Sequence, residues 1–518
     1  MPSIVDTVLP NPRKRVLAAD DAVSRPLKRT KHSLARNAQR AQAGTVGLAG
    51  TVNGECARLV TRSPETGAQA LIVTRLRPFH IGRSPNNDYI VPHPAVSARH
   101  CALYALEADT GEVVVCLEDE STNGTLHNDR KIRHTTVVLN DGDKVEIGGQ
   151  VFRYHHPARE AAARQDTASD SSPQRVGDYL VLPRTLGSGA FSQVHLAIST
   201  VTLKQVACKK LPRRRVSGDR LLVIQREIDM LKSASHPGIN KIEAVEVDNE
   251  FVHIFLELVP GGDLFTYLIT RTRLDAPEGT PSSLRPPHPA DLTSARAAKW
   301  ILYQLLKALE YLHDELGVAH RDVKLENVIL ATRGPFPRVQ LGDFGQARHA
   351  DQRFKSLQGT LQYMAPEQLL AWTRQEGYDG KKADIWAAGI LFALLLTGGH
   401  PFEPFMTSSS AASARYSPHG KAKADSDALF GRSAVAELAR TPADKPVCKN
   451  VVKGEMVLPD MHFGSGDADV RDLLNSMLHP LASSRCTAHE ALQSPWFKSS
   501  EAQLEELYRR VVVERTEG

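Results

Sequence analysis

The sequence lacks paired cysteines, long apolar runs and a secretory leader. Its 518 residues include six cysteines without any C-x-x-C pair, which argues against a disulfide framework and a structural zinc site. Since no run of about 18 apolar residues occurs, no membrane-spanning helix is expected. The N-terminus places its charges after a short apolar piece, the reverse order of a secretory signal. We therefore expect a protein of a reducing, intracellular compartment.

Excess charge of one sign is scarce outside the first 44 residues. These hold nine Lys or Arg against three Asp, whereas the whole chain has a net charge of only +5. Two basic clusters, Lys14-Arg15 and 28–31, resemble a bipartite nuclear import signal and predict a nuclear protein, the alternative being a solvated charge run. Basic residues of this tail are not interleaved with aromatic ones, which does not favour direct nucleic-acid binding.

Composition divides the chain into five segments. A basic tail predicted to be disordered precedes a region of short alternating strands and Asn/Gly turns, a pattern typical of an all-β sandwich. A polar linker leads to a second, larger unit, and a helical tail follows it. The predicted boundaries are 1–54, 55–157, 158–177, 178–498 and 499–518.

The second unit begins with strand-like runs and continues with helical ones. Residues 220–234, "RLLVIQREIDMLKSA", repeat apolar side chains at three- and four-residue steps, which predicts an amphipathic helix. Stretches rich in Pro, Ser and Ala near 271–292 and 403–446 are interpreted as surface insertions. The predicted fold class is therefore multidomain, with an all-β sandwich followed by an α+β bilobal unit.

The first part of the second unit offers the groups that would cover and orient a nucleotide's phosphates. "LGSGAFSQV" is a glycine loop with Ser192 in its third place; alone, it also fits an ordinary hairpin bend. "VACK" places Lys209 on a strand, and Glu227 in the next helix is a suitable partner for its ammonium group.

Further along, "HRDVKLEN" and "DFG" offer the groups of the reaction itself. Asp322 could accept a hydroxyl proton and Lys324 could steady the phosphoryl group. Asn327 and Asp343 supply amide and carboxylate oxygens, the ligands that Mg²⁺ prefers. Each fragment alone could be a helix cap, a turn or a surface lysine, but their order and context match phosphoryl transfer.

These motifs resemble the eukaryotic protein kinase family from Asp178 to about Lys498. The resemblance implies ATP and Mg²⁺ as cofactors, and "HRD" with "GTLQYMAPE" is typical of the Ser/Thr subgroup. It also implies a structural ion pair between Glu367 and Arg485. The nucleotide-binding residues that it implies are Leu186, Gly187, Gly189, Val194, Ala207, Lys209, Glu257 and Asp263.

Resemblance further assigns regulatory and substrate-binding roles. Ser356 lies in the activation segment, where a phosphate could pair with Arg321, and Thr360 contacts the catalytic loop. A plain loop serine is the alternative for Ser356. Asp263 and Glu326 match acidic positions that meet a substrate arginine, which predicts an R-x-x-S/T preference, although Asp263 could bind ribose instead.

The sandwich region carries an ordered set of phosphate-binding residue types. "HIGRSPNND", "VSARH" and "STNGTLHN" present a guanidinium group, a hydroxyl and an amide from adjacent loops, as a phosphate dianion requires. An Asn-Gly pair alone is more often a hairpin turn. The set resembles the forkhead-associated (FHA) domain, which binds phosphothreonine peptides. The resemblance implies phosphate contacts by Arg83 and Ser97, a peptide contact by Asn123 and added charge from Arg99, with Gly82, His100 and Gly124 shaping the loops.

An FHA domain followed by a Ser/Thr kinase resembles the checkpoint kinase 2 family of DNA-damage and meiotic kinases. The chain departs from that pattern because no S-Q/T-Q cluster precedes the FHA domain and no second FHA domain follows the kinase, which favours the meiotic branch. The implied partners are protein substrates and a phosphothreonine on a scaffold or a sister chain. The alternative, a pseudokinase adaptor, predicts losses at Lys209, Asp322 or Asp343 that are not seen.

Overall fold

The computed structural model describes two β-rich regions and one helical region of the chain. The import signal, both insertions, Glu227, Ser356 and most of the predicted helix over 220–234 lie outside the described residues. The described residues are 45–46, 55–63, 67–74, 78–107, 113–156, 173–189, 192–213, 232, 234–268, 295–333, 336–350, 353–354, 359–374, 377–402, 450–451, 456 and 467–514.

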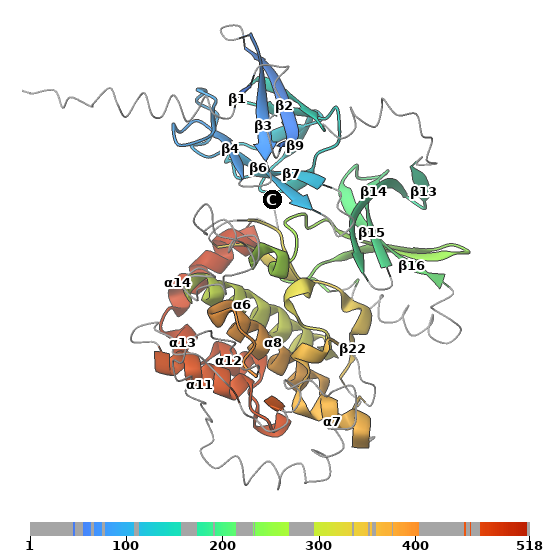
Figure 1. Ribbon diagram of the computed structural model, residues 1–518, viewed down its shortest axis with the longest axis vertical. Helices are drawn as coiled ribbons and strands as arrows, with labels where there is room; N and C mark the ends of the chain where they lie inside the picture. Colours follow the sequence, from blue (N-terminus) through green and yellow to red (C-terminus); the bar gives the residue numbers. More distant parts are fainter. Residues whose placement is uncertain are drawn as a thin grey trace, which may run out of the picture.

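The predicted sandwich is confirmed as two packed sheets (Figure 1). One has the order β1-β3-β2-β12-β11-β8-β9 and the other the order β10-β7-β6-β4-β5. Its strands are β1 (Thr45–Val46), β2 (Glu55–Ser63), β3 (Gly67–Thr74), β4 (Phe79–Gly82), β5 (Tyr89–Ile90), β6 (Cys101–Glu107), β7 (Val113–Asp119), β8 (Thr125–His127), β9 (Arg130–Ile132), β10 (Thr136–Val138), β11 (Lys144–Ile147) and β12 (Gln150–His155).

Alternating side chains of the two sheets fill the sandwich core, as expected for aligned sheets. Leu71 and Phe152 from one sheet meet Leu103 and Leu117 from the other, and all four are completely buried. The first strand differs from the prediction, because Thr45–Val46 falls inside the segment expected to be disordered and pairs with Ala70 and Leu71 of β3.

The smaller lobe of the second unit is a six-stranded sheet of order β13-β14-β15-β16-β18-β17. Its first strand lies within the segment predicted to be linker, because residues 174–176 pair with β14. The bounds are β13 (Gln174–Val176), β14 (Tyr179–Gly189), β15 (Ser192–Ser199), β16 (Gln205–Pro212), β17 (Ile242–Val247) and β18 (Phe251–Glu257).

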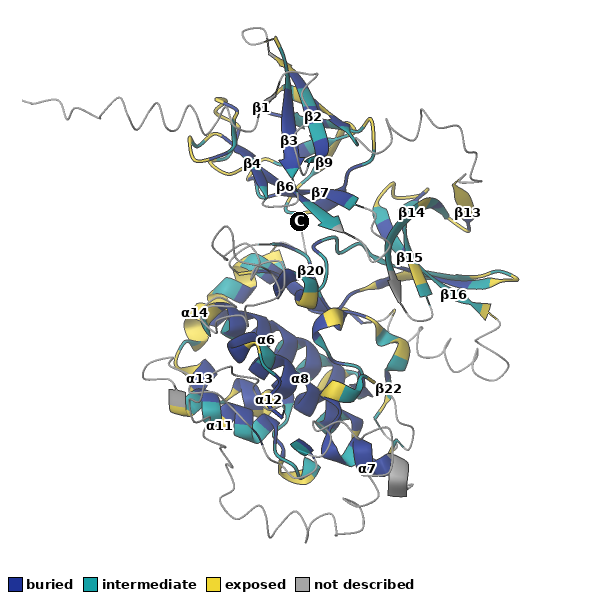
Figure 2. Ribbon diagram, viewed as in Figure 1, coloured by how far each residue is buried: buried dark blue, intermediate teal, exposed yellow. Residues whose placement is uncertain are grey.

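The larger lobe is helical and is built around α8 (Gly380–Thr397), whose residues are buried on nearly all sides (Figure 2). Asp379 caps its first turn by accepting from the backbone N–H of Lys381. The other helices are α6 (Ala295–Glu310), α7 (Pro366–Arg374), α11 (Asp467–Met477), α12 (Ala488–Leu492), α13 (Pro495–Lys498) and α14 (Glu501–Tyr508), the last of which begins the predicted helical tail. In the part of the chain described, no helix is long and apolar enough to cross a membrane.

The predicted ion pair between Glu367 and Arg485 is confirmed. Arg485 donates to both carboxylate oxygens, at 2.7 and 2.9 Å, and its guanidinium group lies 5.0 Å from the ring centre of Trp386. This pair joins α7 to the segment before α12 inside the helical lobe. This bidentate ion pair compensates the charge of the buried guanidinium group, which would destabilise the fold if it were unpaired.

Candidate functional site

The glycine hairpin and Lys209 lie on three adjacent strands of the smaller lobe. Val194 on β15 is opposite Gly187 on β14 and opposite Lys209 on β16, and Gly189 pairs with Ser192 at the tip. A Cβ atom added at Gly187 would meet no heavy atom within 4 Å, so this glycine borders open space. Leu186 precedes Gly187 on β14, and Ala207 lies two residues before Lys209 on β16. Strand pairing therefore places the glycine hairpin next to Lys209.

The catalytic loop is held from behind by Asp384 of α8. This buried carboxylate accepts the backbone N–H groups of His320 and Arg321, both at 2.7 Å, and the ring of His313 at 2.9 Å. Arg321 has a φ of +69°, a left-handed conformation that costs a non-glycine residue energy. Both carboxylate oxygens are thus used to hold the loop in a conformation that it would not adopt alone.

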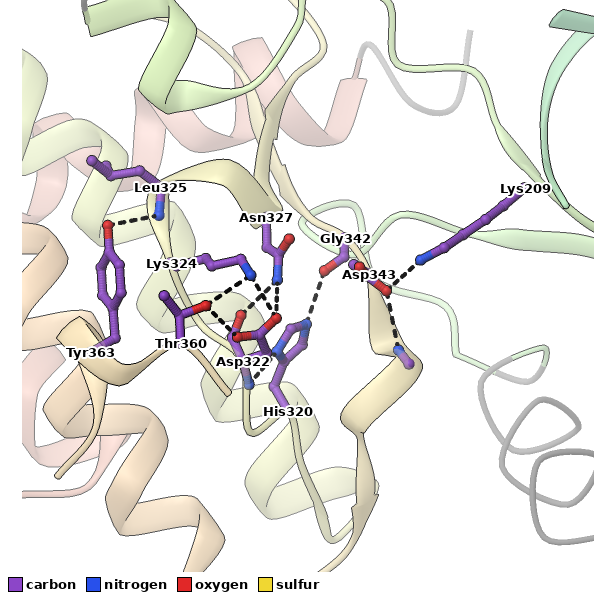
Figure 3. A network of polar contacts seen from close by, with 11 residues as sticks. Lys209, His320, Asp322, Lys324, Leu325, Asn327, Gly342, Asp343, Thr360 and Tyr363 are labelled. Carbon is purple, nitrogen blue, oxygen red and sulfur yellow. Dashed lines mark hydrogen bonds and ion pairs between the residues drawn. The ribbon is translucent and has the colours of Figure 1, made fainter. Parts of the chain in front are cut away.

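Three predicted site residues surround the carboxylate of Asp322 (Figure 3). Lys324 donates to its Oδ2 at 2.9 Å and Asn327 donates to the same oxygen at 3.0 Å. The hydroxyl of Thr360 donates to Oδ1 at 3.2 Å and accepts from Lys324 at 2.9 Å. The structure therefore brings Thr360, predicted to contact the catalytic loop, onto Asp322 itself and fixes the direction of the carboxylate.

Lys209 of the smaller lobe and Asp343 of the larger lobe are in direct contact. The ammonium group donates to Oδ1 of Asp343 at 2.6 Å, and Asp343 has a left-handed φ of +54° (Figure 3). Desolvation by burial acts to raise the pKa of Asp343, but the adjacent Lys209 outweighs it, so the pKa lies below its usual value. Asp343 is therefore ionised at neutral pH.

The donor set of Asn327 and Asp343 fits a magnesium ion. Asn327 directs its Nδ2 to the backbone oxygen of Asp322 at 2.7 Å, which leaves its amide Oδ1 for a metal. Asp343 uses Oδ1 for Lys209, which leaves Oδ2. An amide oxygen and a carboxylate oxygen are hard ligands of the kind Mg²⁺ takes.

The acidic residues near the segment that joins the two lobes differ in what their side chains already contact. Both oxygens of Asp263 accept from Thr266, at 2.7 and 2.8 Å, so Asp263 caps the following turn. The carboxylate of Glu257 contacts Gln340 at 3.2 Å and Arg338 at 3.6 Å. Its backbone N–H donates to Lys241 at 2.9 Å and its carbonyl accepts from Asn240 at 3.0 Å, so its predicted nucleotide contact stays a prediction. Glu326, by contrast, is exposed beside the catalytic loop.

Arg321, the predicted partner of a phosphorylated Ser356, is buried next to the activation segment. It donates to the hydroxyl of Tyr378 at 3.1 and 3.3 Å, and its guanidinium carbon lies 4.1 Å from the ring centre of Phe354. Since Ser356 lies outside the described residues, its contact with Arg321 stays a prediction.

In the sandwich, the candidate phosphopeptide residues lie on adjoining loops. Arg83 donates to the backbone oxygen of Val96 at 3.1 Å, and Asn123 donates to that of Ala95 at 2.8 Å. The hydroxyl of Ser97 accepts from the N–H of Thr122 at 3.0 Å, which joins the two loops. The structure thus places Arg83, Ser97 and Asn123 together.

Close backbone packing shapes these loops. A Cβ atom at Gly82 would lie 2.5 Å from the backbone oxygen of Ala98, and one at Gly124 would lie 2.7 Å from that of Ile132. Gly124 also has a φ of +83°, so it needs glycine for two reasons. Arg99 is also present at this face but contacts His80 at 3.0 Å and Glu120 at 3.4 Å.

A buried histidine supports the backbone of the FHA loops, and another supports the catalytic loop. His100 accepts the N–H of Ser97 through Nδ1 at 3.1 Å, and His320 accepts that of Asp322 through Nδ1 at 3.3 Å. Burial lowers the pKa of both rings, although Asp119 and Asp384 respectively oppose the shift. Both rings are therefore neutral at pH 7, the form that can accept these hydrogen bonds.

Sequence reasoning assigned no role to Asp384 or His313. Asp384 lies in "DIWAAG", a segment that resembles the kinase family, and a carboxylate in such an apolar run signals a buried polar contact. Its partners, 63 and 64 residues earlier, could not be identified from local spacing. Asn87, which donates to the backbone oxygens of Ser84 and Ala98 in the sandwich loops, gave no such signal.

Comparison with known families matches both units. The family model described as "Protein kinase domain" matches residues 180–497, and that described as "FHA domain" matches residues 79–148. The meiosis-specific serine/threonine-protein kinase mek1 of Schizosaccharomyces pombe is 28% identical over 87% of this chain and 88% of that protein. The serine/threonine-protein kinase cds1 of the same organism is 29% identical over 81% of each chain. The meiosis-specific MEK1 of Saccharomyces cerevisiae is 27% identical over 64% of this chain and 70% of that protein.

Proposed function

Since this chain belongs to the protein kinase family, with an FHA domain ahead of its kinase domain, we propose that it phosphorylates Ser or Thr of proteins that a phosphothreonine recruits. The single observation that carries this proposal is the convergence of Asp322, Lys324, Asn327 and Thr360. A pseudokinase adaptor is not favoured, because the groups expected to be lost are present and in contact.

The orientation of Asp322 supports a role as the proton acceptor. A substrate hydroxyl oxygen would bond to the γ-phosphorus of ATP while the bond from that phosphorus to the bridging oxygen breaks and ADP leaves. The hydroxyl proton passes to Asp322, whose carboxylate is held by Lys324 and Thr360. Lys324 would stabilise the transferred group. Asn327 and Asp343 would hold Mg²⁺, which neutralises phosphate charge when bound.

Recruitment would use the FHA loops. Arg83 and Ser97 would contact the phosphate, Asn123 the peptide backbone, and a scaffold or sister chain carrying the phosphothreonine would concentrate the kinase. High local concentration favours phosphorylation of Ser356 by a second copy. The curated relatives named above support a checkpoint or meiotic role in the nucleus, to which the basic clusters before residue 32 would direct the chain.

Of the two acidic candidates, Glu326 is the better partner for a substrate arginine. The side chain of Asp263 already caps its own turn through both oxygens, whereas Glu326 is exposed beside the catalytic loop. A substrate arginine three residues before the target would therefore meet Glu326. Replacing Glu326 by Gln should reduce the preference for R-x-x-S over a peptide without the arginine, by up to about fivefold for an exposed pair.

The first experiment measures phosphate transfer from Mg-ATP to an R-x-x-S peptide by the full chain. We expect transfer by the native protein and none by Asp343→Ala, with phosphothreonine-peptide binding equal in the two. A phosphothreonine scaffold should raise the activity of the native chain and not that of Arg83→Ala. No transfer by the native protein, even on the scaffold and after Ser356 is phosphorylated, would refute the kinase and leave an adaptor.

A further inference from the structure

The second sheet of the FHA sandwich is apolar on both of its faces. Towards the sandwich core it presents Leu103, Val115 and Leu117. The opposite face carries Tyr104, Val114, Cys116 and Val138, all at most 4% exposed. A sheet that faces water on one side alternates apolar and polar residues, so a doubly apolar sheet requires a cover on each face.

Kinase residues supply this second cover. Leu196 of β15 is completely buried in one cluster with the outer-face residues of the FHA sheet. The side chains that pack around this cluster come from β6 itself, from β14 and from the hinge, residues 258–262, which joins the two lobes. In Figure 1, β6 and β7 point to the junction between the strands β14 to β16 and the helical lobe. The packed side chains are Leu106, Leu182, Leu186 and Leu258.

Hydrogen bonds fix the FHA sheet to the smaller lobe. The side-chain amide of Gln205 on β16 accepts the N–H of Val138 at 2.9 Å and donates to its carbonyl at 2.8 Å, so it pairs with the edge strand β10 as a neighbouring strand would. Arg184 on β14 donates to the carbonyls of Leu139 at 2.7 Å and Val113 at 3.2 Å. The backbone groups of Val138, Leu139 and Val113 at the rim of the apolar cluster are therefore hydrogen-bonded to kinase side chains.

The same sheet reaches the hinge and the larger lobe. The thiol of Cys116 contacts the carbonyl oxygen of Pro260 at 3.5 Å. The backbone N–H of Arg333 donates to Glu118 at 3.2 Å, and its guanidinium group lies 5.2 Å from the ring centre of Tyr104. Arg333 also donates to the carbonyl of Gly261 at 2.8 Å. One rigid sheet thus touches both lobes and the segment between them.

We propose that the FHA domain is docked across the back of the hinge as a third layer of the kinase, and that this docking sets the affinity of the nucleotide site. Leu186 and Glu257, two residues of the candidate nucleotide site, border the packed cluster or the hinge. Because the FHA sheet packs against the hinge, these residues are already held in one arrangement. The protein therefore loses less conformational entropy when it binds ATP. The effect of docking on nucleotide binding does not depend on phosphothreonine recognition.

The test is Cys116→Asp in the full chain, which places a carboxylate against the carbonyl of Pro260. The matched control is Val151→Asp, which places the same group on the exposed outer face of the other sheet, where Val151 is 38% exposed. We expect the dissociation constant of an unreactive imido analogue of ATP with Mg²⁺ to rise about 5- to 50-fold for Cys116→Asp, which lies within the range of typical coupling between sites. It should stay within about twofold of native for Val151→Asp, and the hinge amides of Leu258, Val259, Gly261 and Gly262 should exchange faster only in Cys116→Asp.

Phosphothreonine-peptide binding reports whether the FHA domain of each variant is folded. A Cys116→Asp protein that binds this peptide as the native chain does, yet keeps native nucleotide affinity and hinge exchange, overturns the proposal. If Cys116→Asp fails to fold, Gln205→Ala with Arg184→Ala opens the same interface from the kinase side, and unchanged nucleotide affinity there overturns it equally. Absence of peptide binding by the native chain would refute the proposed recruitment alone, because the nucleotide comparison and hinge exchange would still decide on docking.

Discussion

The FHA loops and the kinase catalytic loop both hold groups for a phosphate, but they are supported in different ways. Arg83 and Asn123 are exposed and are anchored to carbonyls of a neighbouring loop. Asp322 is held by Lys324 and Thr360, on a loop that the buried Asp384 fixes from α8. A binding site needs donors at fixed points, whereas a reaction also needs a carboxylate held in one direction, and that takes support from distant parts of the chain.

The largest expected difference between the two sites comes from Asp322→Asn. Loss of the proton acceptor should lower phosphate transfer by about 10² to 10⁴-fold, the usual contribution of a positioned general base. Phosphothreonine-peptide affinity should not change, because the FHA loops share no contact with Asp322. Steady-state kinetics with an R-x-x-S peptide and fluorescence anisotropy with a labelled phosphopeptide measure the two effects. A fall of less than tenfold in transfer would remove Asp322 from the proposed role.

Arg83→Ala should give the opposite pattern. A charge-assisted hydrogen bond to phosphate contributes about 1.5–3 kcal/mol, so peptide affinity should fall by about 10- to 100-fold. Transfer to a free R-x-x-S peptide should stay native, whereas stimulation by a phosphothreonine scaffold should disappear. Arg99→Ala is the comparison variant, with a smaller loss because Arg99 already contacts Glu120. Equal losses in Arg83→Ala and Arg99→Ala would contradict the assignment of the phosphate to Arg83.

The sequence predicts the groups of each site better than it predicts what supports them. Asp322, Lys324 and Asn327 lie within six residues of one another, so their motif could be recognised and their meeting expected. The direct contact of Lys209 with Asp343 and the support from Asp384 join segments far apart in the chain, and no local pattern specifies such pairs. The sequence does carry a sign of FHA docking. A strand with one face exposed to solvent alternates apolar and polar residues, whereas "VVVCLED" begins with a continuous apolar run.

Substitutions at two glycines of the FHA domain can distinguish the cost of backbone strain from the cost of a steric clash. Gly124 and Gly142 have φ values of +83° and +89°, but only a Cβ at Gly124 would meet the backbone of Ile132, whereas one at Gly142 would meet nothing within 4 Å. Gly142→Ala should cost about 1 kcal/mol of FHA stability from strain alone, and Gly124→Ala about 2–4 kcal/mol. Hydrogen exchange of FHA amides measures these costs, and peptide affinity should fall only for Gly124→Ala. Equal costs would mean that the Gly124 loop relaxes away from Ile132.

The smallest expected effect concerns a feature that the two sites share, the neutral histidine behind each loop. The pKa of His100 and of His320 lies below its usual value in the folded chain, so the unfolded chain takes up these protons first. Each ring therefore contributes stability that is present above about pH 6.5, the usual histidine pKa, and is lost as the pH falls below it. The loss is at most about 1.4 kcal/mol per pH unit for each ring, because each exchanges one proton. Hydrogen exchange of the amides of Ser97 and Asp322 between pH 7.5 and 5.5, corrected for intrinsic rates, measures it site by site. Protection that rises on acidification at either amide would show that its histidine is charged in the folded chain, and the two sites would then differ in this respect as well.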